Sequence, residues 1–274
     1  MVPNDVCSAK IATQRVVRLG AALFNGDHGR LAEEIARIEA AGLDFAHLDV
    51  FDGYFVPDIG FAPRTIAALR SLTTLPFEAH LGVKEPLRFA SSLVDAGVDL
   101  ILVHIESTQM IHETIFAIRA LGVRVGVALA LGTGVAFAEP VIGEVDAILL
   151  LSRVTGEGVK GASFDPSALP RLRSLRRCAS KAGVDVDIQV AGGVNRDNAR
   201  ELAREGANSL ALGAGIYRVP DMRSEVERVP SFSLPGASRN RRMDQRPGVK
   251  YEFMACIDWL EVFRQGLSRS PQAP

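Results

Sequence analysis

Apolar residues along the chain follow two different spacings. Short runs in which every residue, or every second residue, is apolar are each followed by a longer segment whose apolar residues recur every three or four positions. The first spacing is typical of a buried strand and the second of an amphipathic helix. Strands are therefore predicted at residues 16–24, 45–50, 77–81, 99–105, 123–129, 147–151, 186–190 and 209–212. Helices are predicted between them, at 29–41, 63–72, 86–96, 111–121, 135–142, 166–182 and 196–205.

A glycine stands at most of the junctions between a predicted helix and the next strand. These junctions include the sequences AGLD, AGVD, LGVR and EGAN, and glycine in such a position commonly ends a helix. Regular alternation of strand and helix predicts parallel strands. Eight units that close on themselves predict a (β/α)8 barrel, with functional residues at the carboxyl ends of the strands. The alternative is an open, doubly wound sheet, but no G-x-G-x-x-G of a dinucleotide site follows the first strand.

The pattern changes after the eighth strand. Residues 219–250 are rich in Arg, Pro, Ser and Gly and are interpreted as a solvated insertion. The segment 251–267 is amphipathic and is interpreted as the last barrel helix, displaced by that insertion. With residues 1–15 as an N-terminal extension and 268–274 as a disordered tail, the barrel is expected to span residues 16–218.

Length, charge and cysteine content narrow the class of protein. The chain has 274 residues, 47% of them hydrophobic, and a formal net charge of −1, which fits one barrel of roughly 250 residues with extensions. A near-neutral chain gives no electrostatic support for binding nucleic acid. No apolar run is long enough to span a bilayer, and no signal peptide is recognised at the N-terminus. The three cysteines are far apart and form no C-x-x-C, so a reducing, cytoplasmic location is expected.

Neighbouring predicted strands carry imidazole and carboxylate groups. His47 and Asp49 share one face of their strand because side chains alternate with a period of two, and Glu78 and His80 share a face of the next strand in the same way. If both faces look into one barrel, these groups converge, and imidazole with carboxylate suits a divalent first-row metal. Unrelated polar residues at strand ends are the alternative. His104, on the fourth strand, is interpreted as a packed or hydrogen-bonded residue rather than a ligand.

Glycines recur at the ends of the last three strands. Backbone N–H groups at such glycines can approach an anion, and barrels often bind phosphate at this place. The predicted phosphate-binding residues are Gly158, Gly161, Gly192, Gly193, Gly213 and Ala214.

A series of stretches in this chain resembles the ribulose-phosphate 3-epimerase family. In order, they are HLDVFDGYFVPDIGFAP, FEAHLGV, DLILVHIEST, GVALALGTGV, GVKG, VAGGVNRDN and LGAGIY, and the likeness extends roughly from residue 18 to residue 217. The resemblance implies a (β/α)8 barrel that acts on a phosphorylated ketose. It also implies a divalent metal (Zn, Fe, Mn or Co) held by the H-x-D pair, the third-strand His and an Asp that opens D-G-G. In that family two Asp residues act as acid and base through a metal-stabilised enediolate.

The resemblance assigns roles to single residues. His47, Asp49 and His80 match three metal ligands, and Asp49 also matches one acid/base. The glycines after the last strands match parts of the phosphate site, with Ala214 where the family often has Ser. The partner implied is a phosphorylated sugar, and the formation of a homo-oligomer is left open.

The chain departs from the family where the chemistry takes place. Ala191 stands in place of the D-G-G aspartate, so the fourth ligand and the second acid/base are absent. Phe51, Gly82 and Arg153 stand where methionines usually cover the metal. Epimerisation removes a proton from one face of a carbon and returns one to the other, which takes two acid/base groups or one that reaches both faces. With one carboxylate fewer, the metal is expected to bind more weakly than is usual for the family.

Three functions are compatible with this sequence. The first is an epimerase-like isomerase with a relocated acid, Glu78 or Glu106, and with Arg153 in contact with the substrate. The alternative for the two glutamates is a partner of a metal ligand or a buried polar network. The alternative for the arginine is a salt bridge to Glu157 or another loop carboxylate. The second function is a single-base ketose/aldose-phosphate isomerase, which needs only Asp49. The third is a catalytically inactive barrel that binds a sugar phosphate.

Overall fold

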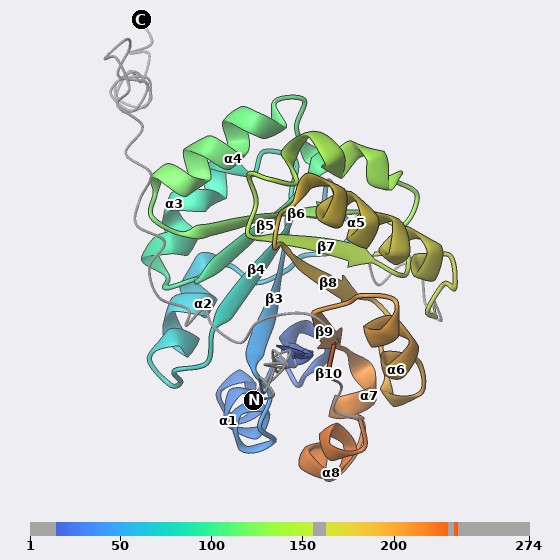
Figure 1. Cartoon of the computed structure of the whole chain (residues 1–274). Helices are drawn as coiled ribbons and strands as arrows, with labels where there is room; N and C mark the ends of the chain where they lie inside the picture. The colour runs from blue at the N-terminus through green and yellow to red at the C-terminus, as the bar shows by residue number, and fades with distance from the viewer. Residues whose placement is uncertain (1–14, 156–162, 230–232, 235–274) are drawn as a thin grey trace, which may run out of the picture. The chain divides into compact units, whose positions relative to one another are not determined.

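The predicted barrel is present in the computed structural model, which describes residues 15–155, 163–229 and 233–234. Eight parallel strands close in the order β2-β3-β4-β5-β6-β7-β8-β9, with helices around the outside (Figure 1). The strands are β2 (Arg18–Ala22), β3 (Phe45–Phe51), β4 (Phe77–Gly82), β5 (Leu100–His104), β6 (Arg124–Leu129), β7 (Ala147–Leu151), β8 (Asp187–Ala191) and β9 (Ser209–Leu212). The predicted (β/α)8 fold is confirmed.

The helices that end before residue 205 lie close to their predicted positions, and the two short helices after it were not predicted. They are α1 (Leu31–Ala40), α2 (Pro63–Arg70), α3 (Leu87–Asp95), α4 (Ile111–Ala120), α5 (Ala168–Ala182), α6 (Arg196–Arg204), α7 (Ala214–Tyr217) and α8 (Met222–Glu227). Short 3-10 helices occur at η1 (Leu23–Asn25), η2 (Ile105–Ser107) and η3 (Val135–Val141). The η3 segment connects β6 to β7 and contains Pro140, which has no N–H to donate and disfavours a regular α-helix there.

Apolar side chains pack on both faces of the strands. The outer core, between strands and helices, includes Leu48 and Leu81. Because side chains alternate along a strand, the opposite faces of the strands point into the barrel, and His104, two residues after the inner Leu102, points inward. The inner cluster consists of Leu100, Leu102, Ala128, Ala147, Leu149, Leu151, Ala191 and Ala211.

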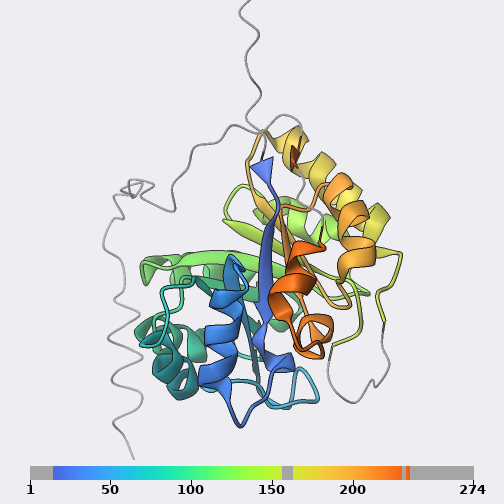
Figure 2. The ribbon, with the colours of Figure 1, turned by 90° about the horizontal axis from the view of Figure 1, so that it is seen from below.

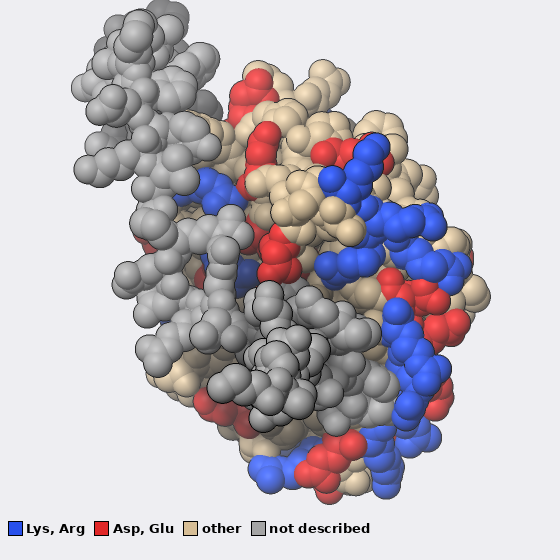
Figure 3. All heavy atoms as spheres, viewed as in Figure 1, with Lys and Arg blue, Asp and Glu red and all other residues tan. Residues whose placement is uncertain are grey.

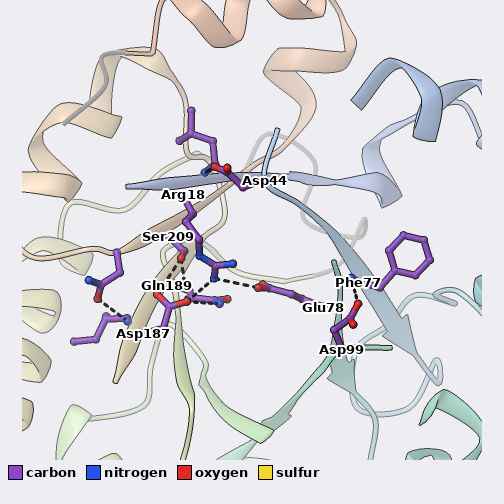
Figure 4. Close-up of polar contacts among 11 residues, drawn as sticks. Arg18, Asp44, Phe77, Glu78, Asp99, Asp187, Gln189 and Ser209 are labelled. Carbon is purple, nitrogen blue, oxygen red and sulfur yellow. Dashed lines mark hydrogen bonds and ion pairs between the residues drawn. The ribbon is translucent and has the colours of Figure 1, made fainter. Parts of the chain in front are cut away.

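A polar network closes the amino-terminal end of the barrel (Figure 4). Arg18 on β2 donates to Asp187 at 2.5 Å and to Glu78 at 3.2 Å, and Ser209 donates to Asp187 at 2.9 Å. Burial raises the pKa of Glu78, although the charge of Arg18 opposes that shift. Buried charges need a partner, so Arg18 holds two carboxylates in place at the floor of the barrel.

Replacing Arg18 with Met is expected to destabilise the fold by about 3–5 kcal/mol, because Glu78 and Asp187 would lose the cation between them. Urea unfolding measures the change. The control is Arg173→Met, since Arg173 pairs with Glu205 at 2.8 Å at the surface, where an ion pair contributes at most about 1 kcal/mol. Equal losses for the two variants would contradict the role given to Arg18.

The segment 219–250, predicted as a solvated insertion, begins with regular structure. Helix α8 buries Met222 and Val226 in the outer core and lies beside α1, as Figures 1 and 2 show. Its six residues are too few for a periodic signal in the sequence. Strand β10 (Ser233–Leu234) pairs antiparallel with β1 (Arg15–Val16). Outside the described residues lie the remaining predictions, at 1–14, 235–250, 251–267 and 268–274.

Charged side chains of both signs cover the helices that follow β7. In Figure 3, Lys and Arg gather on the side where α5 and α6 lie, with Asp and Glu among them. Arg196 on α6 pairs with Glu225 on α8 at 3.4 Å, so some of these charges join neighbouring helices. Within the described part of the chain, no helix combines the length and the apolar character needed to cross a membrane.

Candidate active site

Two histidines and one aspartate meet on the inner face of β3 and β4. His47 precedes Asp49 by two residues on β3, and His80 is the register partner of Asp49 on β4. Asp49 Oδ1 lies 2.8 Å from His80 Nδ1 and 3.6 Å from His47 Nε2. Both imidazoles are 1% exposed. Among the described residues, these three form the one group of His, Cys, Asp or Glu whose ligand atoms all lie within 4.8 Å of one another.

Burial and mutual contacts set the charges of this group. Burial lowers the pKa of His80 to about 4, because it outweighs the opposing effect of the neighbouring Asp49 carboxylate. Burial alone would also lower the pKa of His47, but Asp49 raises it overall. The pKa of Asp49 would rise on burial, yet the two neighbouring imidazoles hold it well below its usual range. Asp49 is therefore ionised at neutral pH, and His80 is uncharged there.

The group fits a divalent cation. Ligand atoms that share one ion at roughly 2.0–2.2 Å can be about 4.4 Å apart at most, and both separations from Asp49 Oδ1 are shorter. His47 Nδ1 is buried without a partner among the described groups, so this ring contacts the site through Nε2. The structure thus contains a buried His-Asp-His group that could hold a metal ion, with coordination positions left for other ligands.

His104 and Glu106 lie behind His80. The Nε2 atoms of His80 and His104 are 2.8 Å apart, and His104 Nδ1 is 2.9 Å from Glu106 Oε2. Glu106 Oε1 also accepts the N–H of Ala130 at 2.8 Å and the hydroxyl of Thr133. His104 is hydrogen-bonded and does not belong to the His-Asp-His group, in agreement with the sequence analysis. Glu106 is thus held by three partners, which leaves little freedom for a relocated acid.

A cavity of ≈260 Å³ lies beside His104, and Arg153 contributes to its lining. The loop after β3 folds back over it, because Asp52 accepts the N–H groups of Phe55 at 2.8 Å and of Lys84 at 2.9 Å. The Phe55 ring lines the cavity with its centroid 5.0 Å from that of His104. A small molecule in this cavity would therefore lie next to His104, which contacts His80 of the His-Asp-His group.

Phe51 and Gly82, at two positions where the resemblance leads us to expect methionine, act as a pair. They are register partners on β3 and β4. A Cβ atom on Gly82 would lie 2.6 Å from Phe51 Cδ1, so the ring fills the space that a side chain at position 82 would need. The same ring meets His80 edge-on, with centroids 5.7 Å apart. One phenylalanine therefore supplies apolar cover for the histidine.

The two glycines at the end of β8 both have left-handed backbone, with φ of 101° at Gly192 and 72° at Gly193. Ser152 donates its hydroxyl to Gly192 O at 2.5 Å, and Asn198 donates to Gly193 O at 3.0 Å. In a trans peptide the N–H points away from the C=O. The N–H groups of Gly193 and Val194 are therefore turned away from those two side chains, as an anion site at this loop requires.

The structure describes two of the four other predicted phosphate-binding residues. Gly213 and Ala214 begin α7, directly after β9, which is the neighbour of β8. Gly158 and Gly161 lie outside the described residues. The four glycine and alanine positions that the structure describes thus follow two adjacent strands, while phosphate binding itself stays a prediction.

Arg153, predicted as a substrate contact, and Glu78, predicted as a possible relocated acid in contact with the substrate, lie at different ends of the barrel. Arg153 follows β7, and its side chain lies over Gly192, where a Cβ atom would be 2.4 Å from Arg153 Cγ. Its predicted partner Glu157 is outside the described residues. Glu78 lies in the floor network with Arg18, so the structure favours the buried-network interpretation of this glutamate.

Comparison with known proteins agrees with this geometry. The sequence pattern of the ribulose-phosphate 3 epimerase family matches residues 18–217. The chain belongs to the ribulose-phosphate 3-epimerase family. It is 35% identical over 215 residues to a ribulose-phosphate 3-epimerase of Synechocystis, which covers 78% of this chain and 93% of the relative. It is 32% identical over 210 residues to that of Escherichia coli, with 76% and 92% covered.

Solved structures of low sequence identity share the fold of this ribulose-phosphate 3-epimerase family member. A 3-hexulose-6-phosphate synthase superposes with a TM-score of 0.59 at 19% identity, over 77% of this chain and 97% of its own. A tryptophan synthase α-subunit from Pyrococcus furiosus superposes with a TM-score of 0.59 at 14% identity, over 80% and 99%. At these identities the likeness establishes the barrel alone.

Among the positions where the sequence analysis notes a departure from the family, Ala191 has the clearest structural setting. It ends β8, is 6% exposed and belongs to the inner cluster, so its methyl group points into the barrel. The structure provides an inward position here, and the sequence fills it with a side chain that cannot bind a metal or carry a proton.

The contact between His80 and His104 is the feature of the site that sequence reasoning missed. A signal was available, because both histidines lie near the ends of neighbouring strands, β4 and β5, and both have inward parity. The separation of their rings depends on the stagger between the two strands, which the sequence pattern does not specify.

Proposed function

We propose that this protein is a ketose-phosphate isomerase of the ribulose-phosphate 3-epimerase type. The observation that supports it best is the buried group of His47, Asp49 and His80 inside a barrel of this family. Its donor set of two imidazoles and one carboxylate suits Zn, Fe, Mn or Co. A bound divalent ion would polarise the substrate carbonyl and stabilise the negative charge that develops on it.

Asp49 is the residue proposed to move the proton. Its carboxylate is ionised at neutral pH and would take a proton from the carbon next to the carbonyl, which turns the substrate into an enediolate. Epimerisation is completed when a proton that has exchanged with solvent is delivered to the opposite face of the same carbon, either by a second acid or by Asp49 if it reaches both faces. His47 and His80 would hold the ion next to this carboxylate, and the Phe51 ring would limit the access of water to His80.

The remaining predicted residues would orient the substrate. We propose that its phosphate binds at Gly192, Gly193, Gly213 and Ala214. Two observations support this: the direction of the backbone N–H groups after β8, and the start of α7 directly after the neighbouring strand β9. Arg153, which lines the cavity beside His104, would contact a negatively charged part of the substrate.

A single-base ketose/aldose-phosphate isomerase is the second candidate, and Ala191 favours it. An enediolate intermediate can be reprotonated on the adjacent carbon from the same face, so one carboxylate is sufficient. Ala191 at the end of β8 turns only a methyl group inward. Asp49 is therefore the one carboxylate of the His-Asp-His group.

Incubation in deuterated water tests both candidates. Tetrose to hexose ketose phosphates would each be incubated with the protein and with Mn, Fe, Co or Zn, and followed by NMR. We expect inversion at carbon 3 with deuterium incorporated there. An aldose product with deuterium next to its carbonyl would instead establish the second candidate. If the metal-bound protein forms no product and exchanges no deuterium with any substrate, only the inactive sugar-phosphate-binding barrel remains.

A further inference from the structure

Four side chains form one continuous line of close polar contacts across the barrel mouth. The line runs from Glu106 Oε2 to His104 Nδ1 at 2.9 Å, from His104 Nε2 to His80 Nε2 at 2.8 Å, and from His80 Nδ1 to Asp49 Oδ1 at 2.8 Å. Both imidazoles are 1% exposed, so water does not compete freely for their nitrogens. In such a line the proton position on one ring decides the proton position on the next.

Glu106 determines which atom is the donor at each contact of the line. Its other oxygen accepts the N–H of Ala130 at 2.8 Å and the hydroxyl of Thr133, which are donors that favour an ionised carboxylate. Burial opposes this, but the hydrogen bonds with His104 and with the Thr133 hydroxyl lower the pKa of Glu106 to about 2. An ionised carboxylate only accepts hydrogen bonds, so His104 must donate to it through Nδ1–H.

The remaining protons follow from the chemistry of imidazole. A neutral ring has one N–H and one lone pair. With its hydrogen on Nδ1, His104 accepts at Nε2, and His80 must be the donor of the 2.8 Å contact between the two rings. That contact uses the single hydrogen of His80 at Nε2, which leaves the lone pair of His80 on Nδ1, directed toward Asp49.

We propose that Glu106 and His104 are positioning residues that hold His80 in its Nε2–H tautomer, so that Nδ1 is the atom offered to a divalent cation. The inference rests on the proposed function in one respect, namely that the His-Asp-His group binds a metal. A lone pair and a carboxylate oxygen that face each other across 2.8 Å repel unless a cation lies between them. The line from Glu106 therefore favours the occupied site and disfavours a simple His80–Asp49 hydrogen bond.

Glu106→Gln tests the direction of the line. The glutamine can keep its carbonyl on Ala130 and Thr133 and turn its NH2 group toward His104 Nδ1, which reverses both rings and puts a hydrogen on His80 Nδ1. We expect the affinity for Co²⁺ and Zn²⁺, measured by calorimetry, to fall about 10–100-fold, as loss of an outer partner of a ligating histidine does elsewhere. Nitrogen-15 NMR of histidine-labelled protein reads the tautomer directly, and the chain has 5 histidines to assign.

Glu144→Gln is the matched control. Glu144 faces His112 Nδ1 at 3.0 Å on the surface, so the same chemical change is made beside a histidine outside the site. We expect it to leave the metal affinity and the His80 tautomer unchanged. Metal-free wild-type protein provides a test that does not depend on any variant folding, because its His80 should carry hydrogen on Nε2.

Different results overturn the inference and the proposed function. Wild-type protein that binds metal but shows His80 protonated on Nδ1 in the metal-free state overturns the inference alone. An unchanged metal affinity in folded Glu106→Gln protein does the same. Wild-type protein with the Nε2–H tautomer that binds no divalent cation overturns the ligand role of Nδ1 and, with it, the metal-dependent function.

Discussion

Asp49→Asn is expected to reduce turnover of the true substrate by at least about 10²–10⁴-fold, the usual contribution of a general acid or base. The change keeps the size of the side chain but removes both the proton carrier and the charged ligand. Metal affinity should fall as well, because the carboxylate oxygen lies 2.8 Å and 3.6 Å from the two histidine nitrogens. NMR-monitored turnover and calorimetry with Co²⁺ measure the two effects.

Asp44→Asn is a suitable control for that experiment. Asp44 directly precedes β3 and accepts the N–H of Leu19 at 2.7 Å, at the opposite end of the strand from the site. The same substitution there should leave turnover and metal affinity close to wild type. Wild-type rates in the Asp49→Asn variant would exclude both enzymatic functions proposed for this chain.

The fold and the centre of the site could be predicted because both depend on short-range periodicity. Alternation along a strand places His47 and Asp49 on one face, and strands that follow one another in a βα-barrel are neighbours, so His80 had to lie beside them. The position of Glu78 shows where this reasoning ends. Parity correctly turns it inward, but its partner Arg18 comes from β2, and the sequence does not indicate which charged residues of separate strands reach the same depth.

Two other features depended on packing rather than on local pattern. The six-residue helix α8 is fixed by burial of Met222 and Val226 against the core, and a helix this short has little stability of its own. The contact of His80 with His104 depends on the stagger of β4 and β5. Long-range packing of this kind decides the details of the site, whereas local periodicity decides which elements form it.

Ala191→Asp is expected to restore a fourth ligand and a second acid/base. The side chain at this position points into the barrel from the end of β8, so a carboxylate there should tighten Co²⁺ or Zn²⁺ binding by about tenfold or more. Epimerisation at carbon 3 should rise by about 10²-fold or more, because protons can then be exchanged on both faces. Metal affinity is measured by calorimetry and the rate by NMR in deuterated water.

Arg153 is the competitor for this new carboxylate. Its side chain lies over Gly192, the residue after Ala191, and an ion pair between the two would divert the carboxylate from the metal. The variant should therefore be compared with Ala191→Asp combined with Arg153→Met, in which the cation is absent. A buried carboxylate without a partner is destabilising, so the double variant should melt at a lower temperature in chelator and recover when metal is added. If neither variant binds metal more tightly and neither shows this recovery, the carboxylate at position 191 does not reach the ion.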